Sequence, residues 1–466
     1  MALIKSISGI RGTIGGEIGE GLTPIDVVYM TAAYGQYITA ACPAPTIVIG
    51  RDARPSGVMI SQLVAATLQS IGIQVLDLGL STTPTVALAV SQLAAQGGIV
   101  ITASHNPGEW NALKLLNKDG EYIDAAAAAD IFSLAAAGKP AFVTANQIGS
   151  YLLREDGYIA QHIQDILSLP LVQRQAIQGR QFKVVVDAVN STGGIAVPLL
   201  LQALGVACTP VFCEVTGIFP HPPEPTTAHL GVLQATLQQG SYDLGIAVDP
   251  DVDRLVIFDE HGEPWGEEYT LVGVADYVLQ HSPGNTVSNL SSSSALAHIT
   301  QAYGGIYTAS PVGEMHVVSQ MKVTDAVIGG EGNGGVIYPP LHYGRDALVG
   351  IALLLSHLAT CDKTASQLRR GYPNTVMCKK KLQLSSDIDP TAVIAWVQDS
   401  YRHFSANTLE GLRVTVEGGW FHLRTSNTEP IMRLCVEGDT QQQADEIASA
   451  VLQRVKDRFP TINIGS

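Results

Sequence analysis

An internal repeat constrains the fold of this chain more than any other feature of the sequence. In three segments a β-branched run is followed by a polar or glycine loop, a helix-period segment and a second apolar run. They begin with PTIVIGRDARPS (45–56), FKVVVDAVNSTGG (182–194) and NTVSNLSSSS (285–294). Apolar residues recur at three- and four-residue steps in the middle pieces, each of which ends at a glycine. We therefore expect each segment to be a βαβ unit with buried parallel strands, as in α/β domains.

The tail of the chain has a different pattern. The runs GLRVTVEGG, WFHLRTSN and IMRLCVEG indicate three strands, and ADEIASAVLQRVKDRF indicates a closing helix. Glycine and proline interrupt the periodicity near Gly149, near Asp259 and within 369–374. We expect three similar α/β domains, with mixed or parallel sheets, followed by a smaller α+β domain. Their expected boundaries are 1–149, 150–258, 259–370 and 371–466.

The composition argues against several classes of protein. A chain of 466 residues, of which 46% are hydrophobic, can bury several cores. The net charge of −15 argues against a nucleic-acid partner, because such proteins present a basic face. The longest apolar stretch, around 349–358, is far shorter than the roughly 18 residues that span a membrane. The six scattered cysteines lack a C-x-x-C pair, so we expect free thiols in a cytoplasmic protein.

The most informative stretch is IVITASHNPGEWNALK (99–114), in which a buried strand ends in a polar loop. A serine at the carboxyl end of such a strand, here Ser104, lies where open α/β sheets bind ligands. Its hydroxyl could act as a nucleophile or phosphoryl carrier, with His105 or Lys114 moving protons. From these residues alone an ordinary turn is an equal alternative, because Ser, Asn and Pro favour turns.

A second strand, in DLGIAVDPDVDR, is followed by Asp249, Asp251 and Asp253 at alternate positions. Three hard oxygen ligands so close together suit Mg²⁺ or Ca²⁺, because their mutual repulsion is costly without a cation. A calcium EF-hand loop does not fit, because its sixth position requires Gly and this chain has Arg254 there. A solvated acidic turn is the remaining alternative.

A third loop, IGGEGNGGV, follows another apolar run and carries Glu331 and Asn333. The carboxylate of Glu331 could accept hydrogen bonds from sugar hydroxyls. Taken alone, the loop fits a glycine turn with a solvated glutamate better.

A fourth loop, LRTSNTEPIMR (423–433), is rich in hydrogen-bond donors. Arg424 and Arg433 offer guanidinium groups, and the hydroxyls of Ser426 and Thr428, the amide of Asn427 and backbone N–H groups lie between them. Such donors bind a phosphate dianion. A capped turn between two strands is the alternative.

Together T-A-S-H-N-P, D-P-D-V-D-R, G-E-G-N-G-G and R-T-S-N-T-E-P resemble the four signature loops of the α-D-phosphohexomutase family, in the same order. The resemblance covers the whole chain and includes the opening S-G-I-R-G, whose arginine, here Arg11, faces the active site in that family. It implies four domains around a central cleft, each contributing one loop. It also implies interconversion of hexose 6-phosphate and hexose 1-phosphate through a phosphoserine and a sugar bisphosphate.

The resemblance also implies a role for each matching residue. The catalytic residues would be the phosphoserine and its charged neighbours, namely Ser104, Lys114, His105, Arg254 and Arg11. Mg²⁺ would be held by the phosphate of Ser104 and by the acidic loop, namely Asp249, Asp251 and Asp253. The substrate would be bound by the third and fourth loops, namely Glu331, Asn333, Arg424, Ser426, Asn427, Thr428 and Arg433.

Two departures from the family pattern concern the substrate. Asn333 stands where many members have Ser, and Glu314 stands where members acting on mannose and glucose phosphates commonly have His. Both favour glucosamine phosphate. The alternatives are a phosphomannomutase or phosphoglucomutase, or an inactive sugar-phosphate-binding homologue. The resemblance implies a monomer or homodimer that acts on a small sugar phosphate, with a sugar 1,6-bisphosphate as activator and without nucleic-acid or membrane partners.

Overall fold

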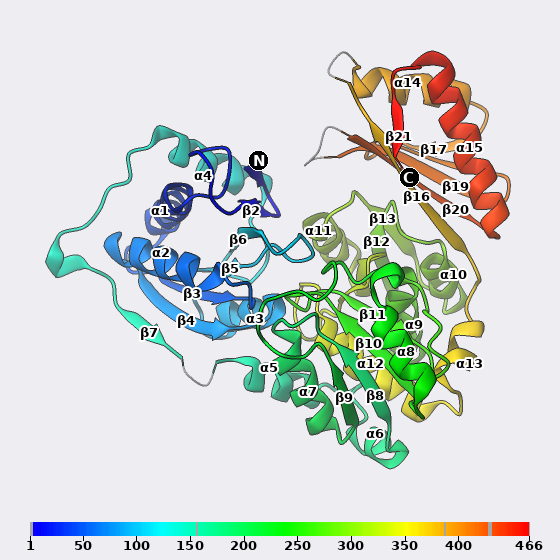
Figure 1. Ribbon diagram of the computed structural model, residues 1–466, viewed down its shortest axis with the longest axis horizontal. Coiled ribbons are helices and arrows are strands. Elements are labelled where there is room, and N and C mark those ends of the chain that lie inside the picture. Colours follow the sequence, from blue (N-terminus) through cyan, green and yellow to red (C-terminus); the bar gives the residue numbers. More distant parts are fainter. Residues whose placement is uncertain (1–2, 155–156, 386–387, 427–430, 466) are drawn as a thin grey trace. The chain divides into compact units, whose positions relative to one another are not determined.

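The computed structural model describes residues 3–154, 157–385, 388–426 and 431–465 (Figure 1). Its backbone contacts divide the chain into two units. One comprises Met1–His281 and Asn333–Arg369, and the other comprises Ser282–Gly332 and Arg370–Ser466. No helix in the described ranges is both long enough and apolar enough to cross a membrane.

The first sheet of the first unit has seven strands: β1 (Ile4–Ser6), β2 (Gly9–Thr13), β3 (Thr46–Arg51), β4 (Gln74–Leu80), β5 (Gly97–Ile101), β6 (Trp110–Leu116) and β7 (Tyr151–Leu153). They lie in the order β1-β2-β6-β5-β3-β4-β7. The pairs β5-β3, β3-β4 and β4-β7 are parallel, and the other pairs are antiparallel.

Helices cover both faces of this sheet (Figure 1): α1 (Pro24–Ala41), α2 (Gly57–Ser70), α3 (Thr83–Gln92) and α4 (Ala125–Ala137). Ile47 and Ile49 of β3 pack in the core that contains α1, α2 and α4. Val48, between them, packs in the separate core under α3. The strand therefore has the two-residue alternation of a sheet that is buried on both faces.

A second sheet of the first unit has four strands: β8 (Lys183–Asp187), β9 (Ala207–Val211), β10 (Leu244–Val248) and β11 (Leu255–Phe258). Their order is β11-β10-β8-β9. The other elements of this part of the unit are α5 (Ile159–Ser168), α6 (Arg174–Arg180), α7 (Gly193–Leu204), α8 (Gly231–Gln239), α9 (Glu267–His281), β15 (Gly335–Ile337), α12 (Ala347–Thr360) and α13 (Ala365–Arg370). Helix α12 packs against α5, α6, α7 and α9, and most of its side chains are buried.

The second unit begins with three strands in the order β13-β12-β14 and two helices: β12 (Asn285–Asn289), α10 (Ala295–Ala302), β13 (Tyr307–Ser310), α11 (Glu314–Thr324) and β14 (Ala326–Glu331). An antiparallel sheet follows, in the order β17-β18-β19-β20-β16-β21. Its elements are β16 (Val376–Gln383), α14 (Pro390–Ser400), β17 (Ser405–Asn407), β18 (Leu412–Val416), β19 (Gly419–Thr425), β20 (Ile431–Gly438), α15 (Gln441–Arg458) and β21 (Asn463–Gly465). Helices α14 and α15 share one apolar core with this sheet.

The three predicted βαβ units are confirmed. They are β3-α2-β4, β8-α7-β9 and β12-α10-β13, and the two strands of each pair in parallel. The glycines expected to end the helices, Gly72, Gly205 and Gly304, have φ of +88°, +75° and +76°. Glycine adopts this left-handed backbone at low cost, so each one turns the chain out of its helix. The three strands and the helix predicted for the tail are also present, as β18, β19, β20 and α15.

Candidate active site

Ser104 lies just beyond the end of β5 and is almost fully buried. Its backbone has φ +50°, in the left-handed region. Its hydroxyl donates a hydrogen bond of 2.7 Å to Oδ2 of Asp249, and Nδ1 of His105 lies 3.4 Å from the same hydroxyl oxygen. The serine loop and the acidic loop, predicted separately from the sequence, therefore meet in one place.

The three aspartates that follow β10 are fully buried and close together. Asp249, Asp251 and Asp253 each have a carboxylate oxygen within 4.8 Å of the others. Burial, together with the two neighbouring carboxylates, raises the pKa of Asp249 well above its ordinary value. Within the described part of the chain, Oδ1 of Asp251 and Oδ1 of Asp253 have no hydrogen-bond partner. Buried carboxylate oxygens that accept no hydrogen bond fit a cation with a preference for oxygen ligands, such as Mg²⁺, which would neutralise their charge.

Lys114, on β6, forms an ion pair with the acidic loop. Its Nζ lies 2.6 Å from Oδ2 of Asp251 and 3.5 Å from Oδ2 of Asp253. Burial by itself would lower the pKa of Lys114, but the facing carboxylates raise this pKa well above its ordinary value. The same ion pair outweighs burial at Asp251 and lowers the pKa of that carboxyl. Lys114 therefore carries a proton at neutral pH in this arrangement.

His105 is neutral at physiological pH because of its surroundings. Burial lowers its pKa well below the ordinary value, and the positive charges of Arg254, Arg11 and Arg345 lower it further. Arg11 also donates a hydrogen bond of 3.3 Å to Oδ1 of Asn106, in the loop that holds the serine. The chain has a net charge of −15, yet this loop lies among cationic side chains, as an anionic phosphoryl group requires.

Two arginines of the site were not predicted from the sequence. Nη2 of Arg345 donates a hydrogen bond of 2.7 Å to Oδ2 of Asp253. Arg54 is fully buried and donates to carbonyl oxygens of the Ser104 loop, two of them through Nη2 at 2.6 Å. The available signal was the R-D-A-R run directly after an apolar strand, which places charged residues where burial is expected.

Glu331 ends β14 in the second unit and is buried. Its Oε1 accepts hydrogen bonds from Nδ2 of Asn289, at 2.9 Å, and from the N–H of Gly313, at 3.1 Å. Asn333 belongs to the first unit, where its Oδ1 accepts a hydrogen bond of 3.3 Å from the N–H of Gly335. The Gly313 contact places Glu331 beside the first residues of α11.

Arg424 lies on β19, directly opposite Arg433 of β20 in the strand register. Its Nη1 lies 3.6 Å from Oε1 of Glu410. Ser426 follows β19, and its N–H donates a hydrogen bond of 2.9 Å to the first carbonyl of β20. Two further predicted residues lie outside the described residues: Asn427 and Thr428. The described part of this loop thus presents two guanidinium groups at the ends of two adjacent strands.

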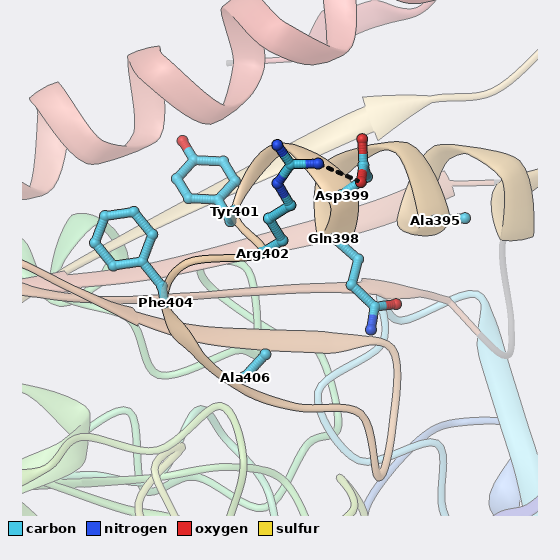
Figure 2. Close-up of a pocket in the computed structure, with 7 residues that line it drawn as sticks. All are labelled: Ala395, Gln398, Asp399, Tyr401, Arg402, Phe404 and Ala406. Carbon is cyan, nitrogen blue, oxygen red and sulfur yellow. Dashed lines mark ion pairs between the residues drawn. The ribbon is translucent and has the colours of Figure 1, made fainter.

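Figure 2 shows a pocket of about 400 Å³ in the second unit, at the end of α14 and beside β17. It is lined by Ala395, Gln398, Asp399, Tyr401, Arg402, Phe404 and Ala406. The ion pair drawn there, between Arg402 and Asp399 at 3.8 Å, is largely exposed, and such pairs contribute little to stability. The pocket contains none of the predicted site residues.

Comparison with known proteins finds relatives along the whole chain. Four family models, all described as phosphoglucomutase/phosphomannomutase, match in order: alpha/beta/alpha domain I at 3–141, domain II at 158–262, domain III at 266–375 and the C-terminal domain at 385–454.

Individual relatives cover nearly the full length. A phosphoglucomutase/phosphomannomutase of Thermococcus kodakarensis is 32% identical over 93% of this chain and 96% of its own length. A phosphoglucosamine/phosphogalactosamine mutase of Sulfurisphaera tokodaii is 29% identical over 98% of this chain and 100% of its own. The crystal structure of a phosphoglucomutase/phosphomannomutase family protein from Burkholderia thailandensis is 26% identical, covers 98% of both chains and has a TM-score of 0.84.

Proposed function

This chain belongs to the phosphoglucomutase/phosphomannomutase family and is an enzyme of the phosphohexomutase type; from that premise we propose that Ser104 carries the phosphoryl group and that glucosamine phosphate is the preferred substrate. The observation that carries the first part is the 2.7 Å hydrogen bond from Ser104 to Asp249, the first of three buried aspartates. A nucleophile and a cation site in contact are what phosphoryl transfer requires.

In the proposed cycle, phosphoserine 104 donates its phosphoryl group to the free hydroxyl of a sugar monophosphate. The P–O bond to the serine breaks and a P–O bond to the sugar forms. The sugar hydroxyl loses its proton and the serine oxygen gains one, so the step has no net change in protons. The resulting sugar bisphosphate turns round, and its other phosphate returns to Ser104. Each transfer is a charge-rich, in-line displacement, so the protein acts mainly by positioning and neutralisation.

Mg²⁺ held by Asp249, Asp251 and Asp253 would supply charge neutralisation at the transferring phosphate. Arg254 and Arg11 add positive charge beside the serine loop. Lys114, which the ion pair with Asp251 keeps protonated, would deliver a proton to the leaving oxygen and recover it in the reverse step. His105 is uncharged and 3.4 Å from the serine oxygen, which makes it a second candidate for proton transfer.

The second unit would bind the substrate. Glu331 would accept hydrogen bonds from sugar hydroxyls, and Asn333, which belongs to the first unit, would be a further contact. The phosphate that is not reacting would be gripped by charged and polar groups of the fourth loop, namely Arg424, Ser426, Asn427, Thr428 and Arg433. Charge-assisted contacts of arginine with a phosphate are often bidentate, so they fix orientation as well as affinity.

Two observations support glucosamine phosphate as the substrate. A relative that covers 98% of this chain is named a phosphoglucosamine/phosphogalactosamine mutase. Glu314 opens α11 immediately after Gly313, whose N–H bonds to Glu331, so this part of the unit carries two carboxylates. A carboxylate attracts the ammonium group of an amino sugar, whereas glucose and mannose have a hydroxyl at that position. The second candidate is a phosphomannomutase or phosphoglucomutase, the name of the 32% identical relative.

A substrate panel with a catalytic amount of sugar 1,6-bisphosphate tests both parts of the proposal. We expect kcat/KM to be highest for glucosamine phosphate, and we expect Glu314→Gln to reduce that preference while leaving the glucose phosphate rate nearly unchanged. Glu17→Gln, at an exposed position of the first unit, is the matched control. A preference for mannose or glucose phosphate would refute the substrate assignment, and the absence of turnover on all three would favour an inactive binding protein.

A further inference from the structure

The backbone of Ser104 adopts a conformation that its residue type disfavours. Its φ of +50° lies in the left-handed region, which L-residues with a side chain rarely enter. Such conformations persist when surrounding contacts over-determine them, and they concentrate at functional sites. The hydrogen bonds around Ser104 therefore indicate which residues hold it there.

The first of these residues is Thr102. Its hydroxyl oxygen accepts a hydrogen bond of 2.9 Å from the N–H of Ser104. The same hydroxyl donates a hydrogen bond of 2.6 Å to Oδ2 of Asp52, which lies just beyond the end of β3. Thr102 and Asp52 are both fully buried. The N–H of Ser104 is thus linked, through Thr102, to the carboxyl group of Asp52 at the end of the adjacent strand.

The second residue is Arg54, whose side chain is completely buried. Its Nη2 donates to the carbonyl oxygens of Ser104 and Asn106, both at 2.6 Å. Its Nη1 donates to the carbonyl oxygens of Pro107, at 2.6 Å, and Trp110, at 2.9 Å. Its Nε bonds to Oδ2 of Asp52 at 3.0 Å. All five N–H donors of the guanidinium are therefore used, four of them on backbone carbonyls from Ser104 to Trp110, the first residue of β6.

We propose that Thr102, Asp52 and Arg54 form a positioning network that holds Ser104 in its left-handed conformation, so that its hydroxyl stays directed at Asp249 and phosphoryl transfer is fast. The network fixes both sides of the serine: Thr102 binds its N–H, and Arg54 binds its carbonyl. The proposal rests on the proposed function, because it assumes that Ser104 carries the phosphoryl group. The hydrogen bonds described above join residues of the network to one another or to the backbone from Ser104 to Trp110. Loss of the network should therefore slow phosphoryl transfer more than it weakens sugar binding.

The test compares Thr102→Val, which keeps the shape and removes the hydroxyl, with Thr102→Ser, which keeps the hydroxyl. Thr31→Val is the matched control, because Thr31 is fully buried in α1 and its hydroxyl has no partner in the described part of the chain. The measurements are kcat, KM, the rate of single-turnover transfer from phosphorylated enzyme to sugar phosphate, and thermal stability. A displacement of a reacting group by about 1 Å can cost about a hundredfold in rate, so we expect kcat of Thr102→Val to fall about 10- to 100-fold with KM nearly unchanged. Thr102→Ser should recover most of the rate, and Thr31→Val should resemble the wild type.

Three results would overturn the positioning role: normal kcat in Thr102→Val, an equal loss in Thr102→Ser, or a rise in KM without a fall in kcat. Arg54→Lys is a second test, because a single ammonium group cannot replace five N–H donors. The rate of phosphoryl transfer in this variant should also fall. If Arg54→Lys does not fold, the comparison of Thr102→Val with Thr102→Ser still tests the positioning role. Wild-type enzyme that turns over without phosphate on Ser104 would refute the proposed function and this proposal together. A phosphorylated wild type with a fully active Thr102→Val would refute only the positioning role.

Discussion

The hydroxyl of Ser104 donates a 2.7 Å hydrogen bond to the carboxylate of Asp249, although the two residues are 145 positions apart in the chain. Each follows the carboxyl end of a strand, β5 for the serine and β10 for the aspartate. Ligands of open α/β sheets bind at such strand ends. Both residues belong to the first unit, so this contact forms within one part of the structure.

Ser104→Ala should abolish turnover without unfolding the protein, because the residue lies in a loop beyond β5 rather than within a strand or helix. Loss of a nucleophile usually costs at least about a thousandfold in kcat. The measurement is steady-state kinetics together with a melting curve. Ser168→Ala, at the end of α5, should leave both unchanged. Residual activity above about a thousandth of wild type would mean that Ser104 is not the obligatory carrier.

Asp251→Asn should lower both metal affinity and activity, because it removes one of three charges that offset a divalent cation. We expect kcat/KM to fall by about two orders of magnitude or more, and calorimetric titration with Mg²⁺ should show weaker binding. A chelator should abolish the activity of the wild-type enzyme, and added Mg²⁺ should restore that activity. Asp119→Asn, in an exposed turn, removes the same charge elsewhere and should have no effect. Full wild-type activity in chelator would contradict the metal assignment.

Arg424→Ala tests whether the fourth loop grips a phosphate. Loss of a charge-assisted contact should reduce kcat/KM for the sugar phosphate by about one to three orders of magnitude, because part of that binding energy positions the reacting hydroxyl. Discrimination between the sugar phosphate and the free sugar should fall as well, while phosphorylation of Ser104 by the bisphosphate persists. Arg402→Ala removes a largely exposed arginine from the same unit and serves as the control. Unchanged kinetics in Arg424→Ala would show that the fourth loop is only a turn between two strands and does not bind the phosphate.

The buried side chain of His422 should make the stability of the second unit depend on pH. Its Nε2 donates a hydrogen bond of 2.7 Å to the carbonyl of Glu410, and its Nδ1 accepts one of 2.8 Å from Ser291. Burial, with smaller effects of Arg424 and Arg413, lowers the pKa of His422 to about 4. The unfolded chain, with a histidine pKa of about 6.5, therefore binds a proton that the folded chain excludes until about pH 4.

The contribution of His422 to the free energy of unfolding should consequently be constant above about pH 6.5 and fall as the pH drops to about 4, by on the order of 3 kcal/mol. Urea denaturation at several pH values measures the slope for the wild type and for His422→Gln. The variant should be less stable at neutral pH and should have a flatter slope. His403→Gln, at an exposed position, should keep the wild-type slope. Equal slopes for wild type and His422→Gln would show that another group causes the pH dependence.

The sequence predicted those elements whose residues follow a clear period. The βαβ units were recognisable because apolar runs, helical spacing and terminal glycines agree with one another. Strand β17 was not predicted, because all three of its residues are exposed and give no alternation. In β16 three consecutive lysines, 379–381, hide the pattern, although Cys378 and Leu382 are buried.

The residues of the candidate site also divide into those that the sequence predicted and those that it did not. Ser104 and the three aspartates could be proposed because their chemistry is concentrated in short loops at strand ends. Arg54 and Arg345 could not, since their roles depend on contacts with residues distant in the chain. The R-D-A-R run shows that charged residues follow a buried strand, but a single sequence contains no record of which groups they contact, and arginines most often lie at the surface.

The most direct measurement is to locate the transferred phosphate. The protein is incubated with sugar 1,6-bisphosphate, its intact mass is recorded, and the modified residue is identified by peptide mapping before and after addition of glucosamine phosphate. We expect one added phosphate on Ser104. When this phosphate carries an isotopic label, the label should pass to the sugar within the turnover time, while unlabelled phosphate from the substrate returns to Ser104. Turnover without any phosphate on Ser104, or a labelled phosphate on Ser104 that added sugar phosphate does not remove, would contradict the phosphoserine mechanism.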